Sequence, residues 1–280
     1  MPGENVKTFR WLGVAGVELT YGGRVLMVDP YLTRFGFLRQ WVGPVRPDGA
    51  SIRAAVPRCD VVLVTHSHWD HLMDVPEIVS YTGATVIGSP NTLQLLTLLC
   101  VPPQGVSVTE AGQSFGVHDF LVRVFEASHP WAPGYGPGTI PVNLRPPLRA
   151  RDYRMDRLFR FHVEVDGIAL ATEPGDGPWQ AQEASVLLVS PRHAEDRLVD
   201  ILQATHPRTV IPYHWDDMYR PLSQPLRPMM APPTLSLRFF GRMDLRAFHE
   251  RIRRIDPRLR VFYPEVLRPY PLEDLVGAES

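Results

Sequence analysis

One short segment constrains the chain more than any other. Residues 61–65 (VVLVT) form a continuous apolar run rich in β-branched side chains, which predicts a buried β-strand. The run leads directly into His66-Ser67-His68-Trp69-Asp70-His71, where four side chains in six residues can ligate a metal. A lone His-x-His is common, but this density of ligands behind an apolar strand is hard to explain as a solvated turn. Imidazole and carboxylate groups together suit zinc, and also iron or manganese.

Three further candidate ligands stand in the same sequence context, beyond the end of a predicted strand. His129 follows a strand predicted up to residue 125, Asp176 follows one at 168–172, and His214 follows one at 208–212. Each alone would more often be a surface or capping residue. Together, and in this order, they would complete two metal sites.

The rest of the chain alternates short apolar runs with helical patterns. Strands are predicted at 7–12, 16–21, 24–28, 84–88, 120–125, 160–165, 185–189 and 259–262, and helices at 74–81, 90–100, 195–204 and 244–255. Residues 31–58 carry scattered prolines and arginines and are predicted as loop. The simplest organisation is a single domain over 1–280, with 130–158 and 218–234 as candidate lid loops.

Composition excludes several classes of protein. The chain has 280 residues, 44% hydrophobic and 21% charged, so it is not a disordered chain, a coiled coil or a collagen-like rod. It lacks an apolar stretch long enough to span a membrane, and its first residues do not form a secretory signal. Two cysteines cannot build a disulfide framework, so we expect a cytoplasmic protein. The formal net charge of −1 gives no general argument for nucleic acid or an anionic membrane.

These motifs resemble the metallo-β-lactamase superfamily over residues 9–214. The resemblance rests on the HSHWDH run, His129, Gly175-Asp176 and His214. The finer similarity is to the branch of ascorbate-6-phosphate lactonase and N-acyl-phosphatidylethanolamine phospholipase D, which also shows an early glycine-bounded strand pair ending in Asp-Pro, here Asp29-Pro30. The resemblance implies an α+β fold, a four-layer αβ/βα sandwich with metals at one edge between two sheets.

The resemblance also implies a ligand set for two divalent ions, with zinc expected and manganese or iron as alternatives. One ion would be held by three histidines, the other by a histidine pair and a carboxylate, and one aspartate would bridge them. In this chain those residues are His66, His68 and His129, then Asp70, His71 and His214, and finally Asp176.

Such a centre would use a metal-bound hydroxide to attack an ester, lactone, amide or phosphodiester bond. Asp70 would also orient the hydroxide or handle a proton, which makes it a candidate catalytic residue. We expect a small anionic substrate, a phosphorylated sugar lactone or a phosphodiester rather than a β-lactam, and neither nucleic acid nor a membrane span. The oligomeric state stays open, with a homo-oligomer as one option.

Other functions of the same fold remain as alternatives. A mononuclear iron dioxygenase would use fewer ligands, and the diiron relatives place glutamate where His68 stands. A metallo-nuclease usually carries an inserted domain or a basic exosite. A metal-holding relative without catalysis is the third alternative.

The sequence departs from the pattern of its relatives at two places. Many relatives have a Gly-His pair where this chain reads Gly13-Val14, and Gly-Asp-Thr is commoner than Gly175-Asp176-Gly177. The groups that would support the ligands are therefore less predictable than the ligands themselves.

Several residues are candidates for supporting roles. Asp29 could orient a ligand histidine or cap a turn, and Asp216 and Asp217 could brace His214 or be solvated. His193 precedes a helix, and a histidine in a comparable place lies near the metals in the phospholipase-like relatives. We take it as a second candidate catalytic residue, against the alternative of an ordinary residue flanking a helix. The arginines of 145–160 could clamp a substrate anion or form a solvated face.

Overall fold

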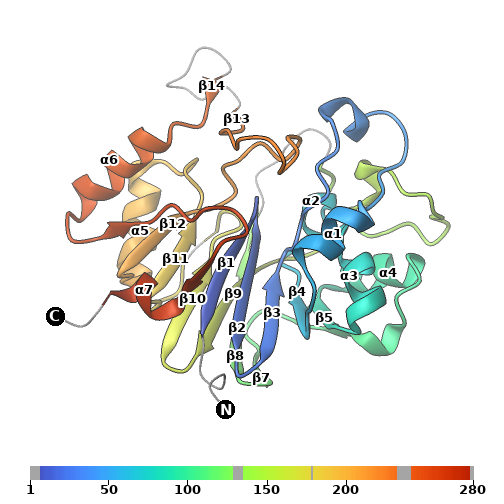
Figure 1. Ribbon diagram of the computed structural model, residues 1–280, viewed down its shortest axis with the longest axis horizontal. Coiled ribbons are helices and arrows are strands. Elements are labelled where there is room, and N and C mark those ends of the chain that lie inside the picture. The colour runs from blue at the N-terminus through green and yellow to red at the C-terminus, as the bar shows by residue number, and fades with distance from the viewer. Residues whose placement is uncertain (1–6, 129–134, 178, 232–240, 278–280) are drawn as a thin grey trace.

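Two β-sheets packed face to face organise the chain. The computed structural model describes residues 7–128, 135–177, 179–231 and 241–277. Helices α1 to α4 cover the outer side of one sheet, and α5 and α6 lie outside the other (Figure 1). The expected four-layer αβ/βα sandwich is therefore confirmed.

The first sheet has seven strands in the order β16-β1-β2-β3-β4-β5-β6. It is antiparallel from β16 to β3 and parallel from β3 to β6. Its strands are β1 (Thr8–Gly13), β2 (Gly16–Tyr21), β3 (Arg24–Val28), β4 (Val61–Leu63), β5 (Thr85–Gly88), β6 (Val106–Val108) and β16 (Pro269–Pro271).

The second sheet repeats this plan in the order β15-β12-β11-β10-β9-β8-β7. It is antiparallel from β7 to β10 and parallel from β10 through β11 and β12 to β15. Its strands are β7 (Ser114–Val117), β8 (Phe120–Ala127), β9 (Leu158–Val165), β10 (Ile168–Thr172), β11 (Val186–Val189), β12 (Thr209–Pro212) and β15 (Arg260–Val261). A separate ribbon pairs β13 (Met230–Ala231) with β14 (Gly241–Arg242).

The helices are short, and side chains cap the N-termini of three of them, α1, α4 and α6. They are α1 (Gly49–Ala55), α2 (Trp69–Leu72), α3 (Val75–Thr82), α4 (Pro90–Leu98), α5 (Glu195–Thr205), α6 (Leu245–Ile255) and α7 (Leu272–Val276), with 3-10 turns η1 (Phe37–Gln40), η2 (Pro103–Gly105) and η3 (Ala150–Asp152). The side chain of Ser89 caps α4 by accepting from the Thr92 amide (3.2 Å), and Asp244 caps α6 at the Ala247 amide (2.9 Å).

One helix lies where the sequence predicts loop. Within 31–58 the chain forms α1, which the Asp48 side chain caps by accepting from the amide and the hydroxyl of Ser51 (3.3 and 2.7 Å). Ile52 is the one residue of α1 that is buried, so the helix has no periodic apolar face for the sequence to reveal. The prediction of loop was wrong there, because burial of the single side chain of Ile52 and the Asp48 cap are enough to form the helix.

A buried ion pair ties the loop after β12 to the first sheet. The Arg34 guanidinium lies 2.7 Å from the Asp216 carboxylate, with side-chain exposures of 1% and 0%. Asp216 also accepts from the Val14 amide (2.8 Å), and Arg34 donates to the Asp217 carbonyl (3.0 Å). Asp216 is therefore not solvated: it holds the loop that carries His214 through Arg34 and Val14, and Asp217 pairs with the Arg227 guanidinium (2.8 Å).

We expect Asp216→Ala to lower the free energy of unfolding by about 3–5 kcal/mol, since it leaves the buried Arg34 charge without its partner. Urea denaturation at neutral pH measures the change. The control is Glu195→Ala, which breaks the exposed Glu195–Arg254 pair and should cost less than about 1 kcal/mol. Equal losses in the two variants would contradict a structural role for the buried pair.

Candidate metal centre

The HSHWDH run forms a buried bend between a strand and a helix. After β4 the chain bends at Thr65 and reaches His68 at the N-terminus of α2, the helix that carries Asp70 and His71. His66 is 1% exposed, and His68, Asp70 and His71 are each 2% exposed. Polar side chains at this depth require partners, so packing alone does not account for them.

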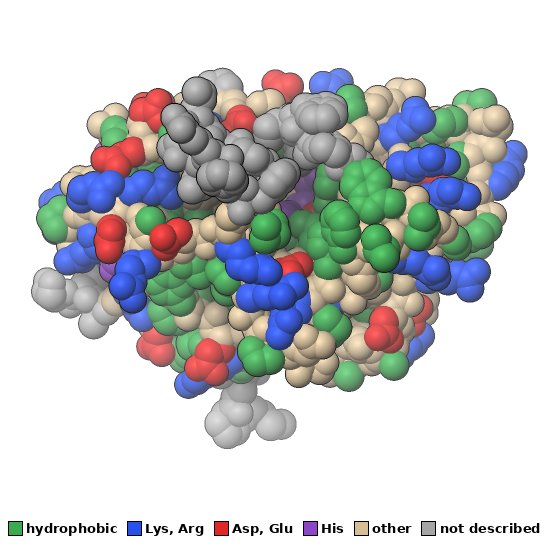
Figure 2. All heavy atoms as spheres, turned by 90° about the horizontal axis from the view of Figure 1, so that it is seen from above, with side chains coloured by type: hydrophobic (Ala, Val, Ile, Leu, Met, Phe, Trp, Pro, Cys, Tyr) green, Lys and Arg blue, Asp and Glu red, His purple; other side chains and the backbone are tan. Residues whose placement is uncertain are grey.

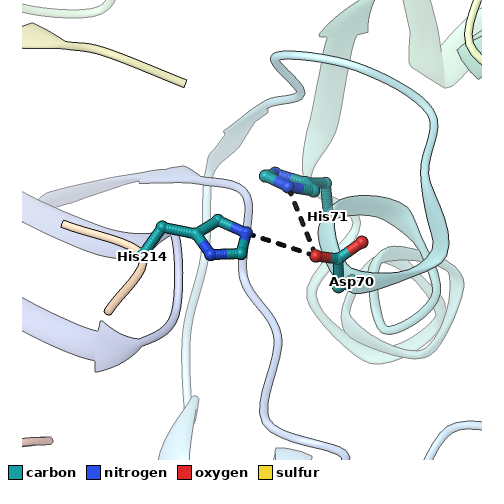
Figure 3. A group of neighbouring side chains, drawn as sticks. All are labelled: Asp70, His71 and His214. Carbon is teal, nitrogen blue, oxygen red and sulfur yellow. Dashed lines mark hydrogen bonds and ion pairs between the residues drawn. The ribbon is translucent and has the colours of Figure 1, made fainter. Parts of the chain in front are cut away.

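The side chains of Asp70, His71 and His214 lie close together. His214 Nε2 lies 3.3 Å and His71 Nε2 3.6 Å from Asp70 Oδ2, and ligand atoms of the three residues all lie within 4.8 Å of one another (Figure 3). His214 comes from the loop after β12, in a left-handed conformation with φ +53°, and its amide donates to the Val14 carbonyl (3.1 Å). The cluster therefore joins side chains from both sheets.

The donor set of this cluster suits a divalent cation. Two imidazoles and a carboxylate are ordinary ligands for zinc, iron or manganese. Asp70 Oδ1 and His214 Nδ1 are buried and have no hydrogen-bond partner among the described residues. A buried carboxylate oxygen without a partner is costly, and a cation beside Asp70 would remove that cost.

The charges of the cluster are arranged to keep Asp70 ionised. Burial alone would raise the pKa of Asp70, but His71, His214 and His68 outweigh burial and hold the pKa well below its usual range. Burial lowers the pKa of His214 despite the opposing effect of Asp70, which favours a neutral, ligating imidazole. Burial would also lower the pKa of His71, but Asp29 and Asp70 raise it overall.

Asp29 orients His71, as one of its two sequence interpretations predicted. Its Oδ2 accepts from His71 Nδ1 (2.7 Å) and from the Thr65 hydroxyl (2.5 Å), and its Oδ1 accepts from the Thr65 amide (2.8 Å). A proton on Nδ1 leaves His71 Nε2 free to face Asp70 and a cation. Carboxylate partners of this kind fix the tautomer of metal-binding histidines.

His66 and His68 lie beside this cluster without joining it. The ring of His66 is centred 3.9 Å from that of His71 and 4.6 Å from that of His68. Within the described part of the chain, Asp70, His71 and His214 are the one group whose ligand atoms come that close together. His129 lies outside the described residues, so the first ligand trio stays a prediction.

Asp176 is positioned by its backbone rather than by its side chain. Its amide and carbonyl pair with Ser128 (2.7 and 2.9 Å), which brings it beside the residue that precedes His129. A side chain at Gly175 would lie 2.3 Å from the Ser128 carbonyl oxygen, so this pairing requires glycine. The Asp176 side chain is 50% exposed, and Asp176 is not among the residues whose ligand atoms all lie within 4.8 Å of one another.

The Arg160 side chain holds the backbone of the loop that carries Asp176. It forms a buried ion pair with Glu173 (2.9 Å) and donates to the carbonyls of Asp176 (2.9 Å) and Gly177 (3.1 Å). Burial raises the pKa of Glu173 to about 7 against the opposing effect of Arg160. Arg160 therefore holds Glu173 and backbone, whereas contact of the arginines of 145–160 with a substrate stays a prediction.

His193 is buried beside Asp176 rather than exposed at the surface. It is 9% exposed, and its Nδ1 is 3.7 Å from Asp176 Oδ1. Burial lowers the pKa of His193 to about 4, with Arg192 and Arg197 adding to the effect and Asp176 opposing it. The imidazole is thus neutral at neutral pH.

Two features of the site were missed from the sequence. Tyr135 lies over His68, with ring centres 4.9 Å apart, yet it comes from a Gly- and Pro-rich segment with no pattern to single it out. Burial lowers the pKa of Arg192 against the opposing effects of Asp176, Tyr135 and Asp70, and Arg192 precedes the buried His193. Only its position next to His193 could have indicated it.

Comparison with known proteins shows the family of the chain. A profile described as "Beta-lactamase superfamily domain" matches residues 24–142. A UPF0173 metal-dependent hydrolase of Symbiobacterium thermophilum is 30% identical over 216 residues, covering 74% of this chain and 83% of the relative. This chain belongs to the UPF0173 metal-dependent hydrolase family. Family membership implies a divalent metal but names neither the element nor the number of ions.

Other UPF0173 members match over shorter stretches. The protein of Cupriavidus necator is 36% identical over 94 residues, and that of Myxococcus xanthus is 33% identical over 119 residues. These matches cover 30% and 37% of the two relatives, so they span only about a third of each protein.

Solved structures show the same fold at low identity. Igni18, a metallo hydrolase from Ignicoccus hospitalis, has a TM-score of 0.61 at 15% identity and covers 95% of this chain and 98% of its own. YhfI from Bacillus subtilis, a metallo-β-lactamase fold protein, has a TM-score of 0.58 at 10% identity and covers 95% and 99%. Among the described residues, no helix is long and apolar enough to cross a membrane.

We expect Asp29→Asn to weaken the binding of a divalent metal about 10–100-fold, because the amide cannot hold a proton on His71 Nδ1 as a carboxylate does. Competition with a fluorescent zinc chelator measures the affinity. Asp60→Asn is the matched control, since Asp60 also accepts from a backbone amide (Val25, 2.9 Å) but lies at the other end of β4. An unchanged affinity in Asp29→Asn would show that Asp29 does not orient a ligand.

Proposed function

We propose that the chain is a dinuclear metal-dependent hydrolase acting on a small anionic substrate. The observation that carries this proposal is the convergence of Asp70, His71 and His214 from opposite sheets, with one buried Asp70 oxygen lacking a partner among the described residues. In this proposal these three residues hold one cation, and Asp176 bridges it to the other.

His66, His68 and His129 would hold the second cation. The ring contacts of His66 with both His68 and His71 support it, because they bring the first pair of histidines next to the Asp70 cluster. The pairing of Ser128 with Asp176 supports it too, since His129 follows Ser128 in the chain. We expect zinc at both positions, with manganese or iron as alternatives.

When bound, two such cations would lower the pKa of a water and polarise the carbonyl or phosphoryl oxygen that is attacked. Asp70 is ionised beside three histidines, so it would accept a hydrogen bond from the attacking water rather than take up its proton. His193 is neutral, and its Nε2 has no hydrogen-bond partner among the described residues. It is therefore placed to hydrogen-bond a substrate oxygen beside Asp176.

The charged group of the substrate would face Arg192. Asp176 and Asp70 favour the charged form of this arginine, and it precedes His193 in the chain, which supports a role in binding an anion. A phosphate or carboxylate there would receive the planar guanidinium as a donor. We accordingly propose an ester, lactone, amide or phosphodiester, and among these a phosphorylated lactone or a phosphodiester, as the substrate class.

We expect protein purified without added metal to hold two zinc or manganese ions per chain, measured by element-specific mass spectrometry. Asp176→Ala and His214→Ala should each lower that content, because each variant removes a proposed ligand. Asp119→Ala, at an exposed turn between β7 and β8, is the control that should retain the metal. A single iron that is insensitive to Asp176→Ala would instead favour the dioxygenase alternative.

We expect hydrolysis of the best substrate in a panel of lactones and phosphodiesters to depend on Asp70 and His193 in different ways. Asp70→Asn should lower kcat about 10²–10⁴-fold, because the amide cannot orient the water as the carboxylate does. His193→Gln should raise KM more than it lowers kcat, since it alters a contact to substrate. Metal content is measured on both variants, and full activity in metal-replete Asp70→Asn would contradict the assignment.

A further inference from the structure

An exposed apolar patch lies on η1 and the turn that follows it. Four side chains that a folded chain would ordinarily bury are instead exposed there: Phe37 (54%), Leu38 (73%), Trp41 (48%) and Val42 (63%). Val142 (90% exposed) lies on the next loop, which is joined to this segment by the Val45 amide and the Leu148 carbonyl (2.9 Å). Grouped exposed apolar side chains of this kind indicate a contact surface.

The same two segments are purely basic. None of the chain's 30 acidic residues lies within 30–47 or 135–151. Five exposed arginines do, and within the described residues they form no ion pair: Arg39, Arg46, Arg145, Arg149 and Arg151. In the view from above, hydrophobic side chains gather beside the hollow in which histidine is seen, and basic side chains border them on the right (Figure 2). The charge of this face suits an anionic partner.

The patch is continuous with the metal centre through aromatic rings. Trp41 contacts Phe37 (centres 6.2 Å apart), and Phe37 contacts Tyr219 (5.2 Å). Tyr219 contacts Trp69 (5.9 Å), which stacks on Tyr135 (6.0 Å), the ring that lies over His68. An apolar wall thus runs from the surface to a proposed ligand.

We propose that this face docks on an anionic lipid bilayer, with Phe37, Leu38, Trp41 and Val42 entering the interface and the five arginines contacting lipid headgroups. Large apolar and aromatic side chains flanked by arginine are the composition that places a segment in a membrane interface. Aliphatic side chains such as Leu38 and Val42 cannot stack on bases, which argues against nucleic acid. Charge alone would suffice to bind an acidic protein, so such a partner would not require the row of aromatic rings that leads from Trp41 to the candidate metal centre.

The test is cosedimentation of the full chain with vesicles of phosphatidylcholine, with and without phosphatidylglycerol. We expect binding to the vesicles with phosphatidylglycerol, weakened by salt. Arg39→Gln/Arg46→Gln should lower the affinity roughly fivefold for each arginine removed. Phe37→Ser/Trp41→Ser should lower it about tenfold or more.

The matched control is Arg254→Gln/Arg258→Gln, which changes the net charge equally on exposed arginines of α6 and the turn after it. It should bind vesicles as the unmodified chain does, and circular dichroism verifies that all variants fold. The assay uses both metal-loaded and chelated protein, so its outcome does not depend on the proposed hydrolase activity.

Three results would overturn the proposal. The first is the absence of binding to phosphatidylglycerol at low salt. The second is a dimer in sedimentation equilibrium that Phe37→Ser/Trp41→Ser converts to monomer, which would make the patch a contact between two copies. The third is salt-dependent binding of RNA that the apolar substitutions leave unchanged.

Discussion

The buried contact between Arg34 and Asp216 fixes how the two sheets meet at the site. Asp216 joins the loop after β12 to Val14 and Arg34, which follow β1 and β3 of the other sheet. His214, two residues earlier, is held against Val14 by its own amide. Because Asp70 and His71 belong to the first sheet's side, the convergence of the cluster depends on this attachment. A small shift of that loop would separate His214 from Asp70.

Much of the site could be predicted because its residues are adjacent in the sequence. The HSHWDH run by itself predicts metal binding, because it holds four possible ligands. Asp29 ends an apolar strand, where a hydrogen-bond partner for a ligand histidine is expected. The role of Asp216 could not be predicted, because its partner Arg34 is distant in sequence and lies in a segment predicted as loop. The roles of His193 and Tyr135 likewise depend on Asp176 and His68, which only the fold brings beside them. The missed α1 shows that one buried side chain and one cap leave no periodic signal.

The net charge of the chain does not reveal that basic residues gather on one face of its surface. A net charge of −1 gives no reason to consider an anionic partner, yet two segments far apart in sequence carry arginines and no acidic residue. Folding places these segments side by side, so their charges add where the average cancels them. Lys7 is the only lysine among the 29 basic residues, so composition predicts that the positive charges of the surface are arginines. It does not predict where on the surface they gather.

The pairing of β16 with β1 has a consequence for the order of assembly. Pro269–Pro271 closes the edge of the first sheet beside Thr8–Gly13, so β1 is synthesised well before the strand that covers its edge. His214 must also emerge before it can meet Asp70. Until β16 is synthesised, β1 therefore exposes an unpaired edge, which is the kind of surface that chaperones protect.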